Sequence, residues 1–405
     1  MRGSRRKSIL AATAAALALA ACLAVSGPAE GAGFRKGPYL LYPGDPSRMT
    51  ILWQTDGTPG HAALAWGPTS ACRRTMEELA EEGAGPDGHL FRATLTGLEP
   101  GRLYHYRVTV DGATRTGSFR AAPPGARGAV TFYGLGDTRS RPDVMNAVLA
   151  RLLADVDEDP VHRQTFCLHA GDWVTRPDEA SWDREFFAPG FAASRAFLSR
   201  LAVMGCRGNH EGDGTLLRKY WPYPYRDPAA CFYSFDYGPV HVTVLDDQAD
   251  LSADSRQVAW LEEDLAGSDR PWKIVLHHVP AWSAGGHQPN ETVRKELAPI
   301  FRRHGVTLVV AGHNHCYARC EVDGITWLTL GGGGAPLSVP DTSAPGVVKA
   351  ALTYHFARFE ADDRTMTVTV FRPDGSVVER FELVRVVAAP VDQRVAEPVA
   401  GARGR

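Results

Sequence analysis

Five apolar segments of this 405-residue sequence each end in polar side chains that could bind a metal ion. The segments are AVTFYGLGD, TFCLHAGD, LAVMGCRGNH, KIVLHHVP and TLVVAGHNH. Their polar ends supply two carboxylates, one amide and three imidazoles: Asp137, Asp172, Asn209, His278, His313 and His315. Such an oxygen and nitrogen set suits zinc, manganese or iron rather than calcium. Singly, each motif is equally well explained as a turn or a surface histidine, but five in this order favour one shared site.

The apolar segments must be strands for their polar ends to meet. After residue 129 they alternate with amphipathic stretches, and this alternation predicts an α/β domain with helices at 144–156, 255–266 and 292–304. Loops beyond the carboxyl ends of strands line the ligand-binding crevice of α/β sheets. Asp137 and Asp172 would repel each other in such a crevice unless a cation lay between them. The sequence therefore predicts a metal site built from strand ends.

Residues 34–122 have a different pattern, in which short alternating runs are separated by turn residues. This pattern predicts an all-β sandwich of about 90 residues. A Pro-Gly turn precedes Leu103 and Tyr104, and this stretch resembles the tyrosine corner of a fibronectin type III sandwich. Residues 121–128, AAPPGARG, are predicted to form a linker to the α/β domain.

The motifs GD, GD, GNHE, HxP and GHxH, in this order, resemble the signature of the calcineurin-like metallophosphoesterases. The segments CFYSFDYGPVHVTVLDD, GHNHCYAR and GITWLTLGGGGAP, with the preceding fibronectin type III-like domain, resemble its purple acid phosphatase branch. The resemblance covers almost the whole chain after its first residues. It implies a layered αββα catalytic domain with two mixed sheets at residues 129–386.

The same resemblance implies a centre of two metal ions, of iron, zinc or manganese. Asp172 would bridge them, Asp137 and His315 would bind the first metal, and the second would be bound by Asn209, His278 and His313. A hydroxide activated by the metals would attack the phosphorus of a phosphomonoester. His210 is expected to contact the phosphate or protonate the leaving oxygen, with loop orientation as the alternative role.

Neighbouring residues receive supporting roles in this interpretation. His277 competes with His278 for the H-x-P motif, but His278-Val279-Pro280 has the better spacing, so His277 is expected to pack behind the site. Glu211 is expected to support its loop. Tyr317 and Arg319 are expected to be structural rather than catalytic.

Two positions depart from the family pattern. Most metallophosphoesterases have D-x-H in the first motif, and purple acid phosphatases supply a tyrosine ligand from GDxxY, but this sequence has Arg139 and Thr175 there. Arginine cannot bind a metal because its guanidinium has no lone pair to donate. The first metal therefore lacks one ligand, and no purple colour is expected even with iron. Arg139 is predicted either to pair with Asp137, to clamp a phosphate, or to point into solvent.

The N-terminus resembles a bacterial export signal. Basic residues precede an alanine- and leucine-rich stretch, and Leu19–Cys22 resembles the lipobox. We expect a lipoprotein signal peptide at 1–21, a lipid on Cys22 that anchors the protein to a membrane of the bacterial cell envelope, and a linker at 22–33. The alternatives are a secretory signal cleaved later and a single-pass anchor, for which the apolar stretch is short. Residues 387–405 lack periodicity and are predicted to be a disordered tail.

Charge and cysteine content narrow the functions further. Residues 1–21 contain four basic residues and no acidic one, so their removal changes the formal net charge from −2 to −6. This balance argues against nucleic acid as a partner.

The later cysteines show no C-x-x-C spacing and are interpreted as packing or disulfide residues: Cys72, Cys167, Cys206, Cys231, Cys316 and Cys320.

Three functions remain in competition. The leading hypothesis is an exported, lipid-anchored phosphomonoesterase. A phosphodiesterase is the second, because the same centre can activate water against either ester. The third is a catalytically weak surface-binding lipoprotein. The sequence does not identify the natural substrate.

Overall fold

A computed structural model of the chain describes residues 33–76, 79–85 and 88–385, without the side chains of 82–87. The predicted signal peptide, Cys22, almost all of the linker at 22–33 and the predicted tail at 387–405 lie outside the described residues.

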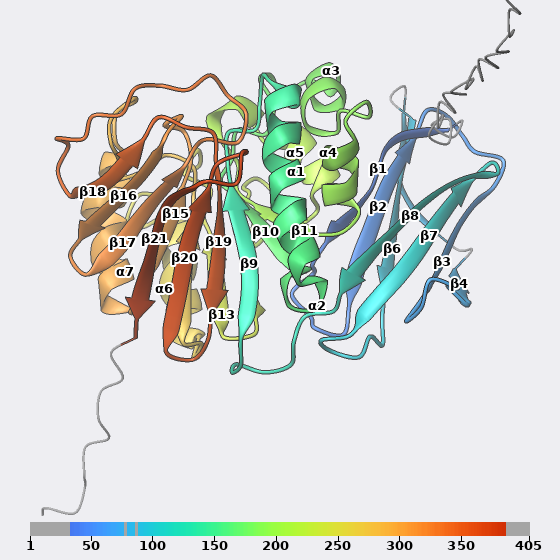
Figure 1. Cartoon of the computed structure of the whole chain (residues 1–405), viewed down its shortest axis with the longest axis horizontal. Helices are drawn as coiled ribbons and strands as arrows, with labels where there is room; N and C mark the ends of the chain where they lie inside the picture. Colours follow the sequence, from blue (N-terminus) through green and yellow to red (C-terminus); the bar gives the residue numbers. More distant parts are fainter. Residues whose placement is uncertain (1–32, 77–78, 86–87, 386–405) are drawn as a thin grey trace, which may run out of the picture.

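The N-terminal part is a β-sandwich, as predicted (Figure 1). One side contains β1 (Phe34–Leu41), β2 (Met49–Thr55), β6 (Gly88–Leu95) and β5 (Ala80–Gly85). The other contains β4 (Arg74–Met76), β3 (Ala62–Gly67), β7 (Leu103–Val110) and β8 (Ala113–Arg120). The predicted tyrosine corner is present, because the Glu99 backbone N–H donates to the Tyr104 hydroxyl oxygen at 2.8 Å.

Two mixed sheets form the middle of the α/β domain. The first contains parallel β9 (Val130–Leu135), β10 (Phe166–His169) and β11 (Ala202–Gly205), and antiparallel β19 (Phe356–Ala361), β20 (Thr365–Phe371) and β21 (Val377–Val384). The second has the order β12 (Tyr233–Tyr237), β13 (Val240–Val244), β14 (Trp272–Leu276), β15 (Leu308–Ala311), β17 (Ile325–Leu330), β16 (Tyr317–Val322) and β18 (Val347–Ala351).

Helices cover the outer faces of these sheets, so the αββα layering is confirmed (Figure 1). On the first sheet lie α1 (Pro142–Glu158), α2 (Pro160–Arg163) and α4 (Ala192–Leu198); on the second lie α6 (Arg256–Gly267), η3 (Val293–Leu297) and α7 (Ala298–Arg303). Short turns of helix occupy the loops: α3 (Glu179–Ser181), η1 (Trp182–Phe186), η2 (Asn209–Glu211) and α5 (Thr215–Tyr220). Between the sheets, the Phe166 ring contacts Phe235 and Tyr237, with centroids 5.5 and 4.7 Å away.

The two predicted domains share a sheet, which the sequence analysis did not anticipate. Strand β1 of the sandwich pairs in parallel with β11 of the α/β domain, with Leu40 opposite Ala202. The result is one ten-stranded sheet, in the order β21-β20-β19-β9-β10-β11-β1-β2-β6-β5. Pairing β1 with β11 satisfies backbone groups on two strand edges that would otherwise be exposed.

An ion cluster fixes β1 against the α/β domain. The fully buried Lys36 ammonium lies 3.2 Å from a Glu179 oxygen and 2.5 Å from an Asp183 oxygen, and it donates to Gln54 at 2.7 Å. A buried charge that loses one partner is left uncompensated. The cluster therefore stabilises the junction of the two parts only while it is complete.

We predict that Lys36→Met lowers the free energy of unfolding by about 3 kcal/mol. This value is the lower limit of the loss expected when a buried ion pair is broken, because both carboxylates are partly exposed. Urea unfolding of the purified protein measures this change. Lys219 is the matched control, because it pairs with the same Glu179 but is 30% exposed, and Lys219→Met should cost less than about 1 kcal/mol. Equal losses in the two variants would contradict the prediction.

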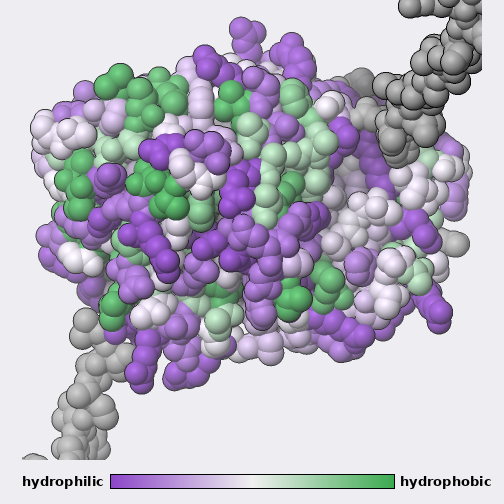
Figure 2. All heavy atoms as spheres, in the orientation of Figure 1, coloured by the Kyte–Doolittle hydropathy of each residue, from purple (hydrophilic) through white to green (hydrophobic). Residues whose placement is uncertain are grey.

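Figure 2 shows one face of the described part, where hydrophobic residues form separate patches among hydrophilic ones. Within this part of the chain, no helix combines the length and the apolar character that crossing a membrane requires.

Candidate metal centre

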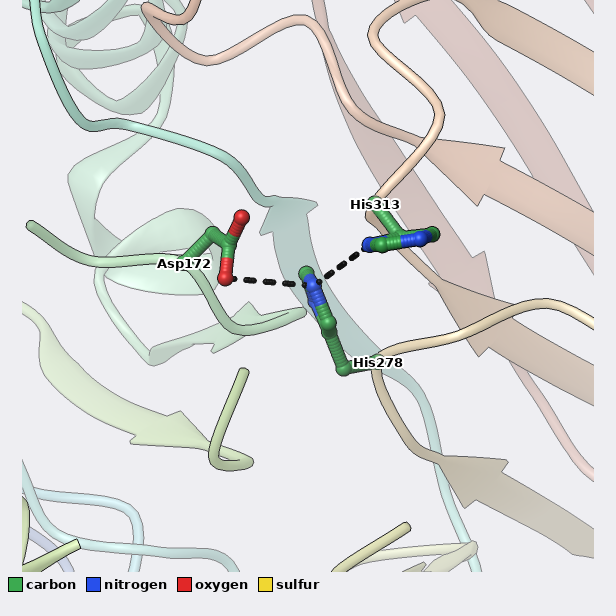
Figure 3. Close-up of side chains that lie close together, drawn as sticks. All are labelled: Asp172, His278 and His313. Atoms are coloured by element: carbon green, nitrogen blue, oxygen red, sulfur yellow. Dashed lines mark hydrogen bonds and ion pairs between the residues drawn. The ribbon is translucent and has the colours of Figure 1, made fainter. Parts of the chain in front are cut away.

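The predicted metal ligands all follow the carboxyl ends of parallel strands. Asp137 follows β9, Asp172 follows β10 and Asn209 follows β11, all in the first sheet. His278 follows β14, whereas His313 and His315 follow β15, in the second sheet. Because the two sheets pack face to face, loops from both meet, and Figure 3 shows Asp172, His278 and His313 converging from three of them.

The backbone is strained where these loops turn. Asp137, Asp172 and His313 have φ angles of 56°, 54° and 66°, in the left-handed region that residues other than glycine rarely adopt. Such outliers cluster where a fold imposes a particular side-chain direction, and each costs about 1–3 kcal/mol. The surrounding packing therefore holds three predicted ligands in directions that their local sequence does not favour.

Asp172, His278 and His313 form one group of possible ligands, whose coordinating atoms lie within 4.8 Å of one another. Nε2 of His278 is 3.2 Å from Oδ1 of Asp172, 3.1 Å from Oδ1 of Asn209 and 3.2 Å from Nδ1 of His313. Burial and the charge of His278 lower the pKa of His313 to about 3, so the His313 imidazole is neutral at neutral pH. Three possible ligand atoms, from Asp172, Asn209 and His313, therefore surround Nε2 of His278.

The tautomer of His278 shows that this group fits a cation. Its Nδ1 is 2.7 Å from the Ala170 carbonyl, which can only accept, so Nδ1 carries a proton and Nε2 of a neutral ring has a lone pair. Burial lowers the pKa of His278, but Asp172 and Asp137 outweigh burial and raise it to about 10. The site thus favours a positive charge at Nε2, which a metal ion supplies.

Asp137, Asp172 and His315 form a second group within 4.8 Å. The Pro336 carbonyl, 2.8 Å from Nδ1 of His315, fixes that tautomer in the same way. Burial and Arg139 lower the pKa of His315 to about 4, so its Nε2 also offers a lone pair. Burial and the nearby Asp172 raise the pKa of Asp137 well above its usual range. Asp172 belongs to both groups, as a ligand that bridges two metals must.

Comparison with known proteins identifies two domains in the chain. A model of the calcineurin-like phosphoesterase family matches residues 131–317, and one of the purple acid phosphatase N-terminal domain matches residues 36–121. The chain thus contains a calcineurin-like phosphoesterase domain and a purple acid phosphatase N-terminal domain. Its two groups of aspartate and histidine, which share Asp172, could hold metal ions.

Purple acid phosphatase 23 of Arabidopsis thaliana is 27% identical to this chain, over 61% of the chain and 63% of the relative. Acid phosphatase type 7 of Homo sapiens is also 27% identical, over 69% of each protein. The chain thus spans less than two thirds of the first relative. Among solved structures, purple acid phosphatase PPD1 from yellow lupin (Lupinus luteus) superposes with a TM-score of 0.74 over 86% of this chain and 75% of its own, at 20% identity, which supports the fold.

Arg139 occupies a position at which the family resemblance predicts a histidine ligand. Its Nε donates to Oδ2 of Asp172 at 3.2 Å, and its Nη2 lies 3.2 Å from Nε2 of His315. The expected pair with Asp137 is wrong: among the described residues, no hydrogen bond of Arg139 reaches that carboxylate, whose oxygens accept the His313 N–H. The alternative of an arginine in solvent is also wrong, because the side chain is 15% exposed and lies between two predicted ligands.

Glu211 and Asp247 hold the ligand loops. The Glu211 carboxylate accepts backbone N–H groups of Asp172, Trp173, Val174 and Gly208 at 2.8–3.3 Å, which agrees with the expected supporting role. Burial and Asp172 raise its pKa to about 7. Asp247 accepts from the backbone N–H groups of His278 and Val279. Sequence reasoning gave Asp247 no role, although two carboxylates directly after the apolar VTVL were a signal.

The close approach of these loops requires glycine at one position. A β-carbon on Gly208 would overlap the backbone nitrogen and Oδ1 of Asp172. The loop after β11 could then not bring Asn209 to within 3.1 Å of His278. The close packing of the two loops therefore explains why the GNHE motif begins with glycine.

Two further histidines border the centre. Nδ1 of His210 lies 2.7 Å from the Thr175 carbonyl, and its Nε2 lies 3.8 Å from Oδ2 of Asp172, with the side chain 28% exposed. The exposed His287 ring lies 4.4 Å from the His313 ring, centroid to centroid. Both imidazoles thus lie beside the possible metal ligands, where a substrate could reach them.

The remaining predicted neighbours lie outside the two ligand groups. His277 is fully buried and its Nδ1 is 3.1 Å from Asp247, behind the ligand loops. Tyr317 and Arg319 both donate to Glu379 of β21, at 2.6 and 2.7 Å, and so connect the two sheets. All six cysteines among the described residues are free and buried, which favours the packing alternative.

Proposed function

We propose that this chain is a metal-dependent phosphoesterase that hydrolyses phosphomonoesters. The observation that supports it best is that Asp172 belongs to two groups of possible metal ligands, each of which combines residues from both sheets. Asp172, Asn209, His278 and His313 would hold one metal, and Asp137, Asp172 and His315 the other. When bound, such a pair of ions lowers the pKa of water towards 7 and neutralises the charge of a phosphoryl group.

The chain's own groups suit the remaining tasks. Because Nδ1 of His210 donates to the Thr175 carbonyl, its Nε2 is the atom available to a substrate. From there it could bind a phosphate oxygen or give a proton to the leaving oxygen. The exposed His287 provides a second imidazole on the same side.

Assays with p-nitrophenyl phosphate and bis(p-nitrophenyl) phosphate, each with manganese, zinc or iron, test the proposal. We expect the monoester to be hydrolysed faster. Faster cleavage of the diester would replace the phosphomonoesterase assignment by a phosphodiesterase. Hydrolysis of neither ester by metal-loaded protein would refute the enzymatic function and leave a binding lipoprotein.

We predict that His210→Ala lowers kcat/KM by about 10²-fold or more, in the range of general acid–base catalysis. If His210 protonates the leaving group, the loss should be greater with phenyl phosphate than with p-nitrophenyl phosphate, whose leaving group needs no proton. An equal loss with both esters would assign His210 to phosphate binding instead. Metal content, measured by mass spectrometry, should match the wild type, because His210 belongs to neither ligand group.

The location of the protein is a separate proposal. We propose that it is exported and anchored to a membrane by a lipid on Cys22, on the basis of the basic start and the lipobox-like Leu19–Cys22. Labelled palmitate should be incorporated in a bacterial host, and Cys22→Ala should abolish the label. Incorporation that persists in this variant would exclude the anchor.

A further inference from the structure

We propose that the Arg139 guanidinium and the first metal ion compete for the same ligands, so that the two metal sites fill in sequence. This inference rests on the metal centre of the proposed function, not on the ester that is cleaved. Arg139 contacts Oδ2 of Asp172, the shared ligand, and Nε2 of His315, a ligand of the first site alone. The guanidinium thus lies where an ion of the first site would bind.

His315 makes the two occupants mutually exclusive. Its Nδ1 donates to the Pro336 carbonyl, so Nε2 has a single lone pair. That lone pair can accept from Arg139 or bind a metal, but not both. Arg139 cannot yield by losing a proton, because its guanidinium stays charged in proteins. The side chain must therefore move out before the first site can bind an ion.

The second site has no such competitor. The contacts around Nε2 of His278 come from Asp172, Asn209 and His313, and among the described residues Arg139 forms no hydrogen bond or ion pair with this histidine. An ion can therefore enter the second site while Arg139 remains paired with Asp172. With one ion bound, the guanidinium still compensates the carboxylates of the first site, Asp137 and Asp172, both of which are buried. The ion that later enters the first site must therefore displace the Arg139 guanidinium.

Calorimetric titration of the chelator-treated full-length protein with Mn²⁺ tests the proposal. The wild type should bind one ion tightly and a second at least about 10-fold more weakly. Arg139→Gln should strengthen only the second binding step, by about 10- to 100-fold, which is the usual change in metal affinity when a group that contacts a ligand is replaced. Arg141→Gln is the matched control, because the exposed Arg141 side chain donates to the Tyr354 hydroxyl and, among the described residues, forms no hydrogen bond or ion pair with a predicted ligand; this variant should behave as the wild type. Two steps of equal affinity in the wild type, or an unchanged second step in Arg139→Gln, would overturn the proposal.

Two further measurements separate this mechanism from a folding defect and from a failed function. Without metal, Arg139→Gln should melt at a lower temperature than the wild type, and excess Mn²⁺ should raise its melting temperature by more. An equal rise in both proteins would contradict the competition. The paramagnetic resonance signal of a coupled Mn²⁺ pair should appear at lower Mn²⁺ in Arg139→Gln. Sequential filling without ester hydrolysis would uphold the competition and refute only the proposed enzyme; absence of any Mn²⁺ binding would refute both.

Discussion

Replacing Asp172 with asparagine is expected to remove most of the bound metal and most of the phosphoesterase activity. Asp172 lies in both ligand groups and also faces His278 at 3.2 Å and Arg139 at 3.2 Å. Burial raises its pKa, but His278 and His210 outweigh burial and hold the pKa below its usual range, so the wild-type residue is a carboxylate. Removing one member of a buried charge pair costs about 3–5 kcal/mol, which corresponds to roughly 10²- to 4 × 10³-fold in metal affinity.

Asp155 offers a matched control for this substitution. It is equally buried, but it lies on α1 and contacts Tyr133 and Arg358 rather than the metal ligands. Asp155→Asn should lower stability and leave the metal content per folded molecule unchanged. Metal analysis and turnover of both variants measure the difference. Wild-type turnover in Asp172→Asn would rule out the shared carboxylate as the centre of the mechanism.

The ligand set was predictable because it depends on local chain signals. Each strand is a short apolar run, and its polar residue follows directly, with a glycine beside it in four of the five segments. Strands β9, β10, β11, β14 and β15 all formed as expected, and their carboxyl ends face the same region. The residue that follows a parallel strand lies at the carboxyl end of the sheet. The order of strands and polar residues in the sequence was therefore enough to predict that Asp137 and Asp172 lie close together.

The partners of Arg139 and the shared sheet were not predictable for a different reason. Asp137 lies two residues from Arg139 in the sequence, which made it the natural partner, but its oxygens accept the His313 N–H from another sheet. Arg139 therefore forms its hydrogen bond with Asp172 instead. The pairing of Leu40 with Ala202 likewise joins segments 162 positions apart, and an apolar strand pattern does not specify which edge it will pair with.

Glu211→Ala is expected to be the most destabilising single change near the centre. The carboxylate accepts four backbone N–H groups, two on each oxygen, and the side chain is buried. An unsatisfied buried donor costs about 1–3 kcal/mol, so even the lower limit gives about 4 kcal/mol for four donors. Urea unfolding should show this loss, and calorimetry should show weaker metal binding, because the Asp172 loop loses its attachment to Gly208.

Glu185 supplies the comparison that isolates this cause. Its hydrogen bonds to Ser140 and Thr175 all end on one oxygen, Oε2, so the amide of Glu185→Gln can keep them. In Glu211→Gln, by contrast, an NH₂ group must face two backbone N–H donors, because both carboxylate oxygens are used. We therefore expect Glu211→Gln to lower the free energy of unfolding by about 2 kcal/mol or more, and Glu185→Gln by less than about 1 kcal/mol. Similar losses for the two amide variants would mean that Glu211 acts through its charge rather than through the four donors that it holds.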